Sequence, residues 1–588
     1  MLSAAGMDKA REVMEVTMGR AKADLVITNS ILLNVYTREL LPRQNVAIKG
    51  AWIAYVGPEE EERIGPTTKV IDALGKVMVP GFIDSHTHIA DGFIKPSEFL
   101  RYTIAGGTTT IVTEIIEPYP ITGYEGLLDF LASLQDQPIK VFATAPAMVS
   151  TSENAQGLPE EVLGKLLMRD DVLGLGESYW QGVLQEPEIF LPNFKKTLDM
   201  GKKLEGHSAG AKGPRLMAYL STGISSCHES TDAQDVLERL RLGIHVMVRE
   251  GSIRRDLAEI AKIKDTKVDF RRLILVTDGL NPADLHDMGN MDYVVQKAID
   301  CGFDPVIAIQ MATVNPAEYF SLEGILGGIA PGKYADLVIL PDIQTIKPEW
   351  VISMGQIAFR AGELLLQPRD HLFSEKSLNT IRLTRRYDAS DFSISAAGRT
   401  SPVKVRVIDQ VTDLVTKEYV ASLPVIDGKI QSVPGKDLLK IAAIDRVFSP
   451  GKKSLGLIRG FSLRAGAVAS SSAWDTSDII VVGENEKDMA GAVNRVVELR
   501  GGAVVCVGGE IVAEIPLPIF GLMSDLPMES LVQGYRKLAK TMKDLGCPLK
   551  DPLRTLTTLT CAAIPFLRIC EEGLVDIKTG KRVGLFVD

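Results

Sequence analysis

The chain has 588 residues, 45% hydrophobic and 24% charged, and its 65 Lys and Arg against 75 Asp and Glu give a net charge of −10. This composition can fill several buried cores, which excludes a disordered or collagen-like protein. An acidic chain with no cluster of Lys and Arg is poorly suited to nucleic acid or to an anionic membrane, so neither is expected as a partner.

Targeting features of the sequence point to the cytoplasm. The longest apolar stretches, such as VMVPGFI at 77–83, are far shorter than the ~20 residues that cross a bilayer. The N-terminus alternates charged and apolar residues and lacks the apolar region of a secretory signal. The six cysteines are scattered without a C-x-x-C pair, which indicates reduced thiols. We therefore predict a soluble cytoplasmic protein.

Two distant segments repeat the same five residues. ADLVI stands at 23–27 and again at 335–339, and further β-like runs follow each copy. One interpretation is coincidence between two buried strands. The other, which we adopt, is one β-sandwich domain built from residues 1–78 and 331–385, with another domain inserted between its two parts.

The inserted region, residues 79–330, alternates β-like runs with helical patterns. Helix-like stretches such as SEFLRYTIAG (97–106) separate most of the runs. Eight βα units in about 250 residues predict a (β/α)₈ TIM barrel. The eight runs lie at 79–89, 108–114, 140–148, 171–177, 202–210, 223–230, 244–252 and 272–279.

The pattern of predicted strands and helices changes after about residue 385. RRYDASDFSIS (385–395) and VKVRVIDQV (403–411) begin a stretch of β-like runs, and helical patterns follow later. Residues 386–588 are therefore predicted to form a third unit of α+β type. The expected fold class is α/β: a TIM barrel with a composite β-sandwich domain and an α+β C-terminal domain.

The polar residues at the ends of the barrel runs are the candidate active-site residues. His86 and His88 are two apart on the first run, so both side chains point to one face of a strand. Barrel enzymes build their active sites at the carboxyl ends of the strands. Unrelated strand-end residues are the alternative interpretation, but four histidines and two acids on one rim favour a shared site. The other members end runs four, five, six and eight: Glu177, His207, His228 and Asp278.

Four imidazoles and two carboxylates suit a pair of divalent cations, because a carboxylate can bridge two ions. Water bound to such metals loses a proton near neutral pH, which supplies hydroxide for hydrolysis at an sp² carbon. Asp278 is the predicted proton acceptor beside the metals. Glu114 and Glu117, which end run two, are also predicted to handle protons.

At this point the sequence resembles the adenine deaminase family of the amidohydrolase superfamily over nearly its whole length. The resemblance rests on PGFIDSHTHI, DVLGLGE, EGHSAG and GISSCHE in the barrel region. It continues in the C-terminal region with GFSLRAGAVASSSAWD and AEIPLPIFGLMSD. This resemblance implies hydrolytic removal of the 6-amino group of adenine, which gives hypoxanthine and ammonia.

The resemblance also implies how the ligands are shared. It places His86, His88 and Asp278 on one metal, His207 and His228 on the other, and Glu177 between them. Manganese or iron is favoured, and zinc would satisfy the same ligands. A small purine-like substrate and a homo-oligomer, with a dimer favoured, are expected. Three further residues are predicted to contact substrate: Asp91, Glu250 and Ser252. A role in stabilising the fold is the alternative for Glu250 and Ser252.

The sequence departs from the family pattern close to these residues. Four family histidine positions hold other side chains, and Ala90 and Gly279 replace family acids. Drift at surface sites is one explanation. The other is that the positions line one substrate-facing wall, so that a different substrate is bound or an accessory metal is lost. The four histidine positions are occupied by Ile116, Asn281, Trp474 and Ser477.

These departures leave two alternatives to adenine deamination open. The first keeps the metal centre and changes the substrate to an N6-substituted adenine, or to the ring amide of an oxidised purine such as xanthine. The second is a catalytically silent binding or regulatory protein, against which the retention of Asp278 argues.

Overall fold

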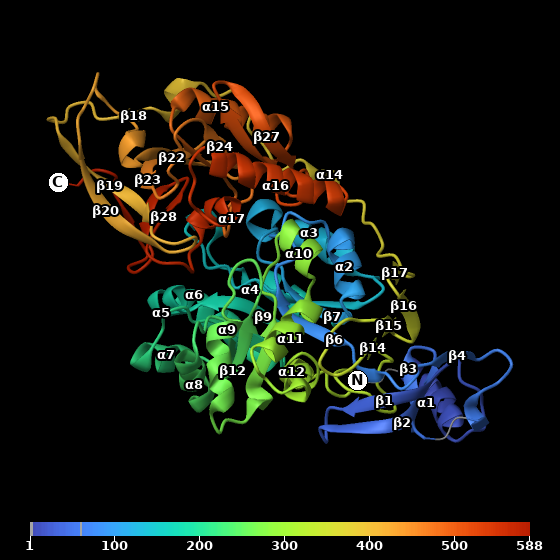
Figure 1. The fold of residues 1–588 in the computed structure, drawn as a ribbon. Helices are drawn as coiled ribbons and strands as arrows, with labels where there is room; N and C mark the ends of the chain where they lie inside the picture. Colours follow the sequence, from blue (N-terminus) through green and yellow to red (C-terminus); the bar gives the residue numbers. More distant parts are fainter. Residues whose placement is uncertain (1–3, 59–60, 588) are drawn as a thin grey trace.

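The structure is a computed structural model that describes residues 4–58 and 61–587. Figure 1 shows three parts in a row: a sheet of blue N-terminal strands and yellow strands β14–β17, a central barrel coloured from blue through green to yellow-green, and a C-terminal unit in orange and red. Among the described residues, no helix is both long and apolar enough to span a membrane.

The two ends of the first 365 residues form one nine-stranded sheet. The strands that carry the two ADLVI segments both contact β5, because β14 pairs with it antiparallel and β1 pairs with it parallel. The strands expected to form a sandwich are thus hydrogen-bonded as one continuous sheet, and α1 (Ala4–Thr17) packs against β2 and β3. The strand order is β17 (Glu363–Leu364), β16 (Gln356–Arg360), β15 (Trp350–Ser353), β14 (Leu337–Leu340), β5 (Val77–Pro80), β1 (Leu25–Asn34), β2 (Glu39–Lys49) and β3 (Trp52–Gly57), with β4 (Lys69–Asp72) beside β1.

The central region is a barrel of eight parallel strands, as predicted from the eight runs. Nearly all residues of its strands are buried, as expected of strands that are covered on both sides. The strands are β6 (Phe82–Thr87), β7 (Thr108–Glu114), β8 (Lys140–Ala145), β9 (Val172–Tyr179), β10 (Lys203–His207), β11 (Ser226–Cys227), β12 (His245–Arg249) and β13 (Leu273–Val276).

Short contacts close the ring between the five-stranded sheet β6–β10 and the three-stranded sheet β11–β13. Thr87 bridges Asp278 in parallel, and the Asp278 amide donates to the carbonyl of His86 at 3.0 Å. On the other side the Ser225 amide donates to the carbonyl of Leu204 at 3.1 Å. The helices between and after the strands are α2 (Pro96–Ala105), α3 (Tyr119–Leu134), α4 (Glu160–Leu167), α5 (Trp180–Gln185), α6 (Pro187–Asp199), α7 (Gly213–Leu220), α8 (Ala233–Arg241), α9 (Leu257–Ile260), α10 (Pro282–Met288), α11 (Met291–Asp300), α12 (Pro305–Met311) and α13 (Val314–Tyr319).

The C-terminal unit is centred on an eight-stranded sheet. Its order is β20 (Thr416–Leu423), β19 (Val403–Gln410), β23 (Lys453–Arg459), β22 (Leu439–Asp445), β25 (Asp478–Gly483), β24 (Ala467–Ser470), β26 (Gly502–Val507) and β27 (Glu510–Pro516). Two small sheets flank it: β18 (Ile394–Ser395) with β21 (Lys429–Ile430), and β28 (Leu567–Cys570) with β29 (Gly573–Asp576) and β30 (Lys581–Val583). The helices are α14 (Glu375–Leu378), α15 (Glu486–Glu498), α16 (Met528–Asp544) and α17 (Pro552–Thr557).

The C-terminal unit docks on the rim where the barrel strands end. The amide of Ser524 donates to the carbonyl of Phe93 at 2.9 Å, and the amide of Met528 donates to the Glu98 carboxylate at 3.1 Å. In Figure 1, α16 and α17 lie over α2, α3 and α10. The unit therefore covers the end of the barrel at which barrel enzymes hold their active sites.

Candidate metal centre

The barrel brings together the six residues that the sequence nominated as metal ligands. His86 lies in β6 and His88 follows it directly, two residues along the chain. Glu177 lies in β9, His207 ends β10, and His228 and Asp278 follow β11 and β13. All six side chains are buried. They form two overlapping groups whose ligand atoms lie within 4.8 Å of one another, and Glu177 belongs to both.

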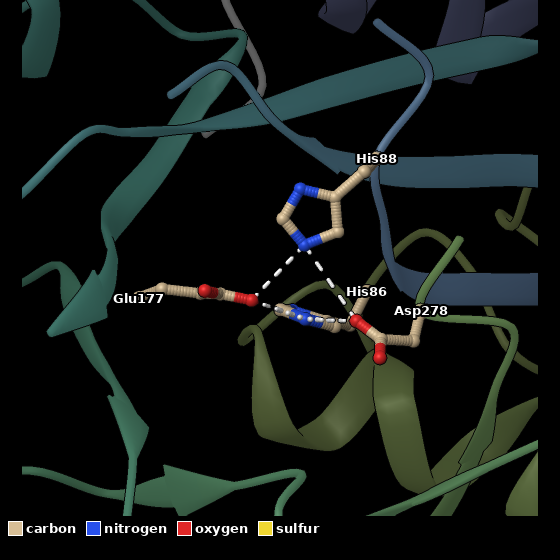
Figure 2. Close-up of side chains that lie close together, drawn as sticks. All are labelled: His86, His88, Glu177 and Asp278. Carbon is tan, nitrogen blue, oxygen red and sulfur yellow. Dashed lines mark hydrogen bonds and ion pairs between the residues drawn. The ribbon is translucent and has the colours of Figure 1, made fainter. Parts of the chain in front are cut away.

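The first group is drawn in Figure 2, where Glu177 and Asp278 face the two histidines of β6. His86 Nε2 lies 3.2 Å from Glu177 Oε1 and 3.4 Å from Asp278 Oδ1. His88 Nε2 lies 3.0 Å from Glu177 Oε1 and 3.6 Å from Asp278 Oδ1. Two imidazole nitrogens and two carboxylate oxygens thus converge on one point.

The second group shares Glu177 with the first. Glu177 Oε2 lies 3.5 Å from His207 Nδ1, and Oε1 lies 3.3 Å from His228 Nε2. The two imidazoles are 3.1 Å apart, between His228 Nε2 and His207 Nδ1. Glu177 therefore offers an oxygen to each group, as a carboxylate between two cations must.

The donor set fits divalent cations. His86 Nε2 is buried and makes no hydrogen bond within the described part of the chain, although two carboxylates face it. Burial opposes protonation of His88, but the negative charges of Glu177 and Glu117 outweigh it and raise the pKa of His88 to about 10. The cluster therefore attracts positive charge, and a cation can take the place of these protons.

Arg249 binds the carboxylate of Asp278, the predicted proton acceptor, through the oxygen that does not face the histidines. Asp278 Oδ1 faces the two histidines of β6, whereas Oδ2 accepts a hydrogen bond from Arg249 Nη1 at 3.2 Å. Burial raises the pKa of Asp278, but its bond to His86 and the charge of Arg249 outweigh this and hold the pKa well below its usual range. Arg249 also contacts Glu229 and Asp256, so three carboxylates fix the guanidinium.

The two acids of strand two lie behind the histidines. Glu117 Oε1 is 2.6 Å from His88 Nδ1, on the side opposite the first group. Glu114 Oε1 lies 3.8 Å from His86 Nδ1 and accepts the amide of Glu177 at 3.2 Å. Burial raises the pKa of Glu114 to about 8. Glu205, which was not among the predicted site residues, lies 3.7 Å from the same His86 nitrogen.

The structure does not bring the three predicted substrate contacts into the cluster. Asp91 forms a buried ion pair with Arg554 of the C-terminal unit. Glu250 accepts hydrogen bonds from the Tyr293 hydroxyl and the Leu257 amide, and Ser252 donates to Asp284. Their polar atoms are therefore engaged in holding loops together. The residues around the adjoining cavity are others.

A cavity of about 340 Å³ opens directly on the cluster. Glu177, His207, His228 and Asp278 form its floor on the barrel side. The C-terminal unit supplies the opposite wall with Leu414, Val415, Trp474, Thr558, Cys561, Ala563, Ile564 and Pro565. The other residues around the cavity are Tyr179, Ala209, Gly210, Lys212, Glu229, Thr231, Asp235, Arg249, Ile253 and Arg254. The cavity thus requires both the barrel and the C-terminal unit.

The hypothesis that the four altered histidine positions line one wall is wrong. Trp474 lines the cavity, but Ile116 is buried in the hydrophobic core beside the barrel. Asn281 caps the N-terminus of α10 and donates to Asp551, and Ser477 donates to Asp445 within the C-terminal unit. The positions lie in three different loops, and of the four only Trp474 lines the cavity.

Comparison with known proteins agrees with the two main parts of the fold. Residues 77–365 match the amidohydrolase family, and residues 413–581 match the adenine deaminase C-terminal domain. A curated adenine deaminase from Moorella thermoacetica is 36% identical over 584 residues, which cover 98% of each chain. One from Cenarchaeum symbiosum is 35% identical over 568 residues, 96% of this chain and 93% of the other. One from Ruegeria sp. is 36% identical over 590 residues, 98% and 97% of the two chains.

Proposed function

The chain belongs to the adenine deaminase family of amidohydrolases, and on that premise we propose that it hydrolyses adenine to hypoxanthine and ammonia. It is a hydrolase that acts on a C–N bond. The observation that carries the proposal is the six-residue cluster at the carboxyl ends of the barrel strands, which opens on a cavity of about 340 Å³.

We propose the following ligands for two divalent cations. His86, His88 and Asp278 hold one cation, His207 and His228 hold the other, and Glu177 contacts both. Bound cations of this kind supply a water molecule of lowered pKa and polarise the bond that is attacked. Manganese or iron is the proposed metal, and zinc suits the same imidazole and carboxylate ligands.

Asp278 is the proposed general base and acid. Its carboxylate accepts the proton that the attacking water loses and returns it to the amino nitrogen, which leaves as ammonia. Arg249 orients this carboxylate through its bond to Oδ2 and keeps it ionised. Glu117 holds the ring of His88 through Nδ1, and Glu114 and Glu205 lie behind His86. Such outer carboxylates fix the orientation and tautomer of ligating histidines.

A second candidate keeps this cluster and changes the ring. An N6-substituted adenine, or the ring amide of an oxidised purine such as xanthine, would use the same ligands. The observation that favours it is Trp474, which lines the cavity at a position where the family pattern has histidine.

Turnover on a purine panel separates the two candidates. The protein is reconstituted with manganese, iron or zinc and offered adenine, N6-methyladenine, guanine, xanthine and hypoxanthine. Ammonia release and ultraviolet spectra report which ring reacts. We expect adenine to give the highest kcat/KM. Faster turnover of N6-methyladenine or xanthine would replace adenine by the second candidate, and no turnover with metal bound would contradict both.

The remaining expectations about the protein's surroundings are part of the proposal. We infer a cytoplasmic enzyme that forms a homo-oligomer, with a dimer favoured, and that has no nucleic-acid or membrane partner. The domain boundaries after residues 78, 330 and 385 likewise stay predictions.

A further inference from the structure

The structure assigns a role in substrate selection to the C-terminal unit. Resting on the proposed function, we propose that Trp474 is the wall against which the purine ring packs, and that it is a specificity-determining residue. Tyr179 and Asp475 act as positioning residues that hold its indole.

Trp474 lies where the C-terminal unit faces the barrel cluster. It belongs to the C-terminal unit, yet it lines the same cavity as Glu177 and Asp278. The centroid of its ring lies 5.0 Å from that of His88. A purine whose C6 atom reaches the cluster must therefore pass within contact distance of this indole.

A chain of hydrogen bonds holds the indole of Trp474 in place. Trp474 Nε1 donates to the Tyr179 hydroxyl at 3.1 Å, and that hydroxyl donates to Asp475 Oδ1 at 3.1 Å. Asp475 Oδ2 accepts the amide of Ala562 at 3.1 Å. Because the only polar atom of the indole is bonded to Tyr179, the surface that Trp474 presents to the cavity consists of carbon. This chain of bonds fixes an aromatic wall and leaves no polar group of Trp474 to be satisfied by substrate.

The cavity beside Trp474 has a size and a lining that suit a purine. The cavity of about 340 Å³ equals about eleven water molecules at liquid density, which is room for a purine of ten non-hydrogen atoms. Leu414, Val415, Ile564 and Pro565 continue the apolar surface beyond Trp474. A flat aromatic base fits such a wall, because every base offers a π-face to an aromatic side chain.

Intrinsic fluorescence tests this contact without requiring turnover. The chain has four tryptophans, at 52, 180, 350 and 474, and hypoxanthine is titrated into the metal-reconstituted protein as the probe. Trp474→Phe is compared with Trp52→Phe, a matched control because Trp52 stacks on Tyr334 in the N-terminal sheet. We expect hypoxanthine to quench emission of the wild type and of Trp52→Phe, but not of Trp474→Phe. Equal quenching in both variants would overturn the proposal.

Steady-state kinetics test how much packing against Trp474 contributes to substrate binding. Removing a stacking side chain weakens binding of a base by about 5- to 150-fold. We expect Trp474→Ala to raise the KM for adenine within this range while kcat changes little, since packing serves the bound substrate and the transition state alike. Trp474→Phe should restore most of the affinity. A fall in kcat with unchanged KM in Trp474→Ala would contradict the proposal that the purine ring packs against Trp474.

The two proposals fail in different ways. If the wild type turns over no adenine, the proposed function fails, and the same quenching experiment with each purine of the panel still decides whether Trp474 contacts the bound ring. If the wild type is active on adenine and Trp474→Ala, shown to be folded by circular dichroism, keeps the wild-type KM, the function stands and the wall is rejected.

Discussion

The metal cluster and the wall opposite to it are built in different ways. Every residue of the cluster lies near or just beyond the carboxyl end of a strand of one barrel, so the arrangement of the parallel strands sets its geometry. The wall comes from loops of the C-terminal unit around residues 414, 474 and 561–565, which are far apart in the chain. The barrel thus supplies all the candidate metal ligands, whereas the C-terminal unit supplies the wall of the cavity that faces them.

Removing metal should have the largest effect, because it removes the reaction without touching the wall. We expect chelation to reduce deamination to background, because the bound cations would supply the activated water. Ammonia release and the melting temperature are measured before and after chelation, because a ligand that binds only the folded state stabilises it. Manganese, iron and zinc are then restored separately. Full activity in protein shown to be metal-free would contradict the assignment.

Asp278→Asn should have the next largest effect. The substitution keeps the shape of the side chain and the Oδ1 position but removes its basicity, and general acid–base groups contribute about 10²–10⁴-fold. We expect kcat to fall by that factor on the purine that is turned over, while metal stays bound by His207 and His228.

Asp256→Asn is the matched control, because Asp256 binds the other side of the same guanidinium. Arg249 Nη2 lies 3.2 Å from Asp256 Oδ2. If Asp256→Asn reduces kcat as much as Asp278→Asn with both metals bound, the effect comes from the position of Arg249, and Asp278 is not the base.

Glu117→Gln should have an intermediate effect. Losing the carboxylate behind a ligating histidine costs about 10- to 100-fold in metal affinity or activity. We expect the first metal site, which contains His88, to need a higher metal concentration for half-maximal activity. Glu114→Gln serves as comparison, because Glu114 lies 3.8 Å from His86 and makes no close bond to it. A larger loss in Glu114→Gln, with metal content unchanged, would make Glu114 a proton-handling group instead.

Sequence reasoning reached the barrel and its rim because both follow from periodic rules. His86 and His88 share a strand face, and residues such as Glu177 and Asp278 end strands that all point the same way. The same rule could have found Glu205, which lies two residues before His207 on β10 and therefore on the same face. Arg249 ends β12, so its place at the rim was also readable.

Other parts of the site follow no local rule. Trp474 meets Tyr179 only because the C-terminal unit docks on the rim, through contacts such as the Asp91–Arg554 ion pair. The roles of Glu250 and Asp91 depend on which way their side chains turn in loops, which strand order does not determine. The continuous nine-stranded sheet likewise depends on the pairing of β14 with β5, across some 250 residues of chain.

Glu250→Gln and Ser252→Ala should have the smallest effect. They test whether the barrel loops, as well as the C-terminal wall of the cavity, contribute to substrate binding. Glu250 binds Tyr293 and the Leu257 amide, and Ser252 binds Asp284, so both side chains support loops outside the cavity. Gln keeps an acceptor for one of these bonds. We therefore expect each variant to change the KM for adenine by no more than about twofold, measured beside Trp474→Ala under the same metal conditions. If either variant raised KM as much as Trp474→Ala, the barrel loops would select the substrate together with the C-terminal unit, and the division of labour drawn from the geometry would fail.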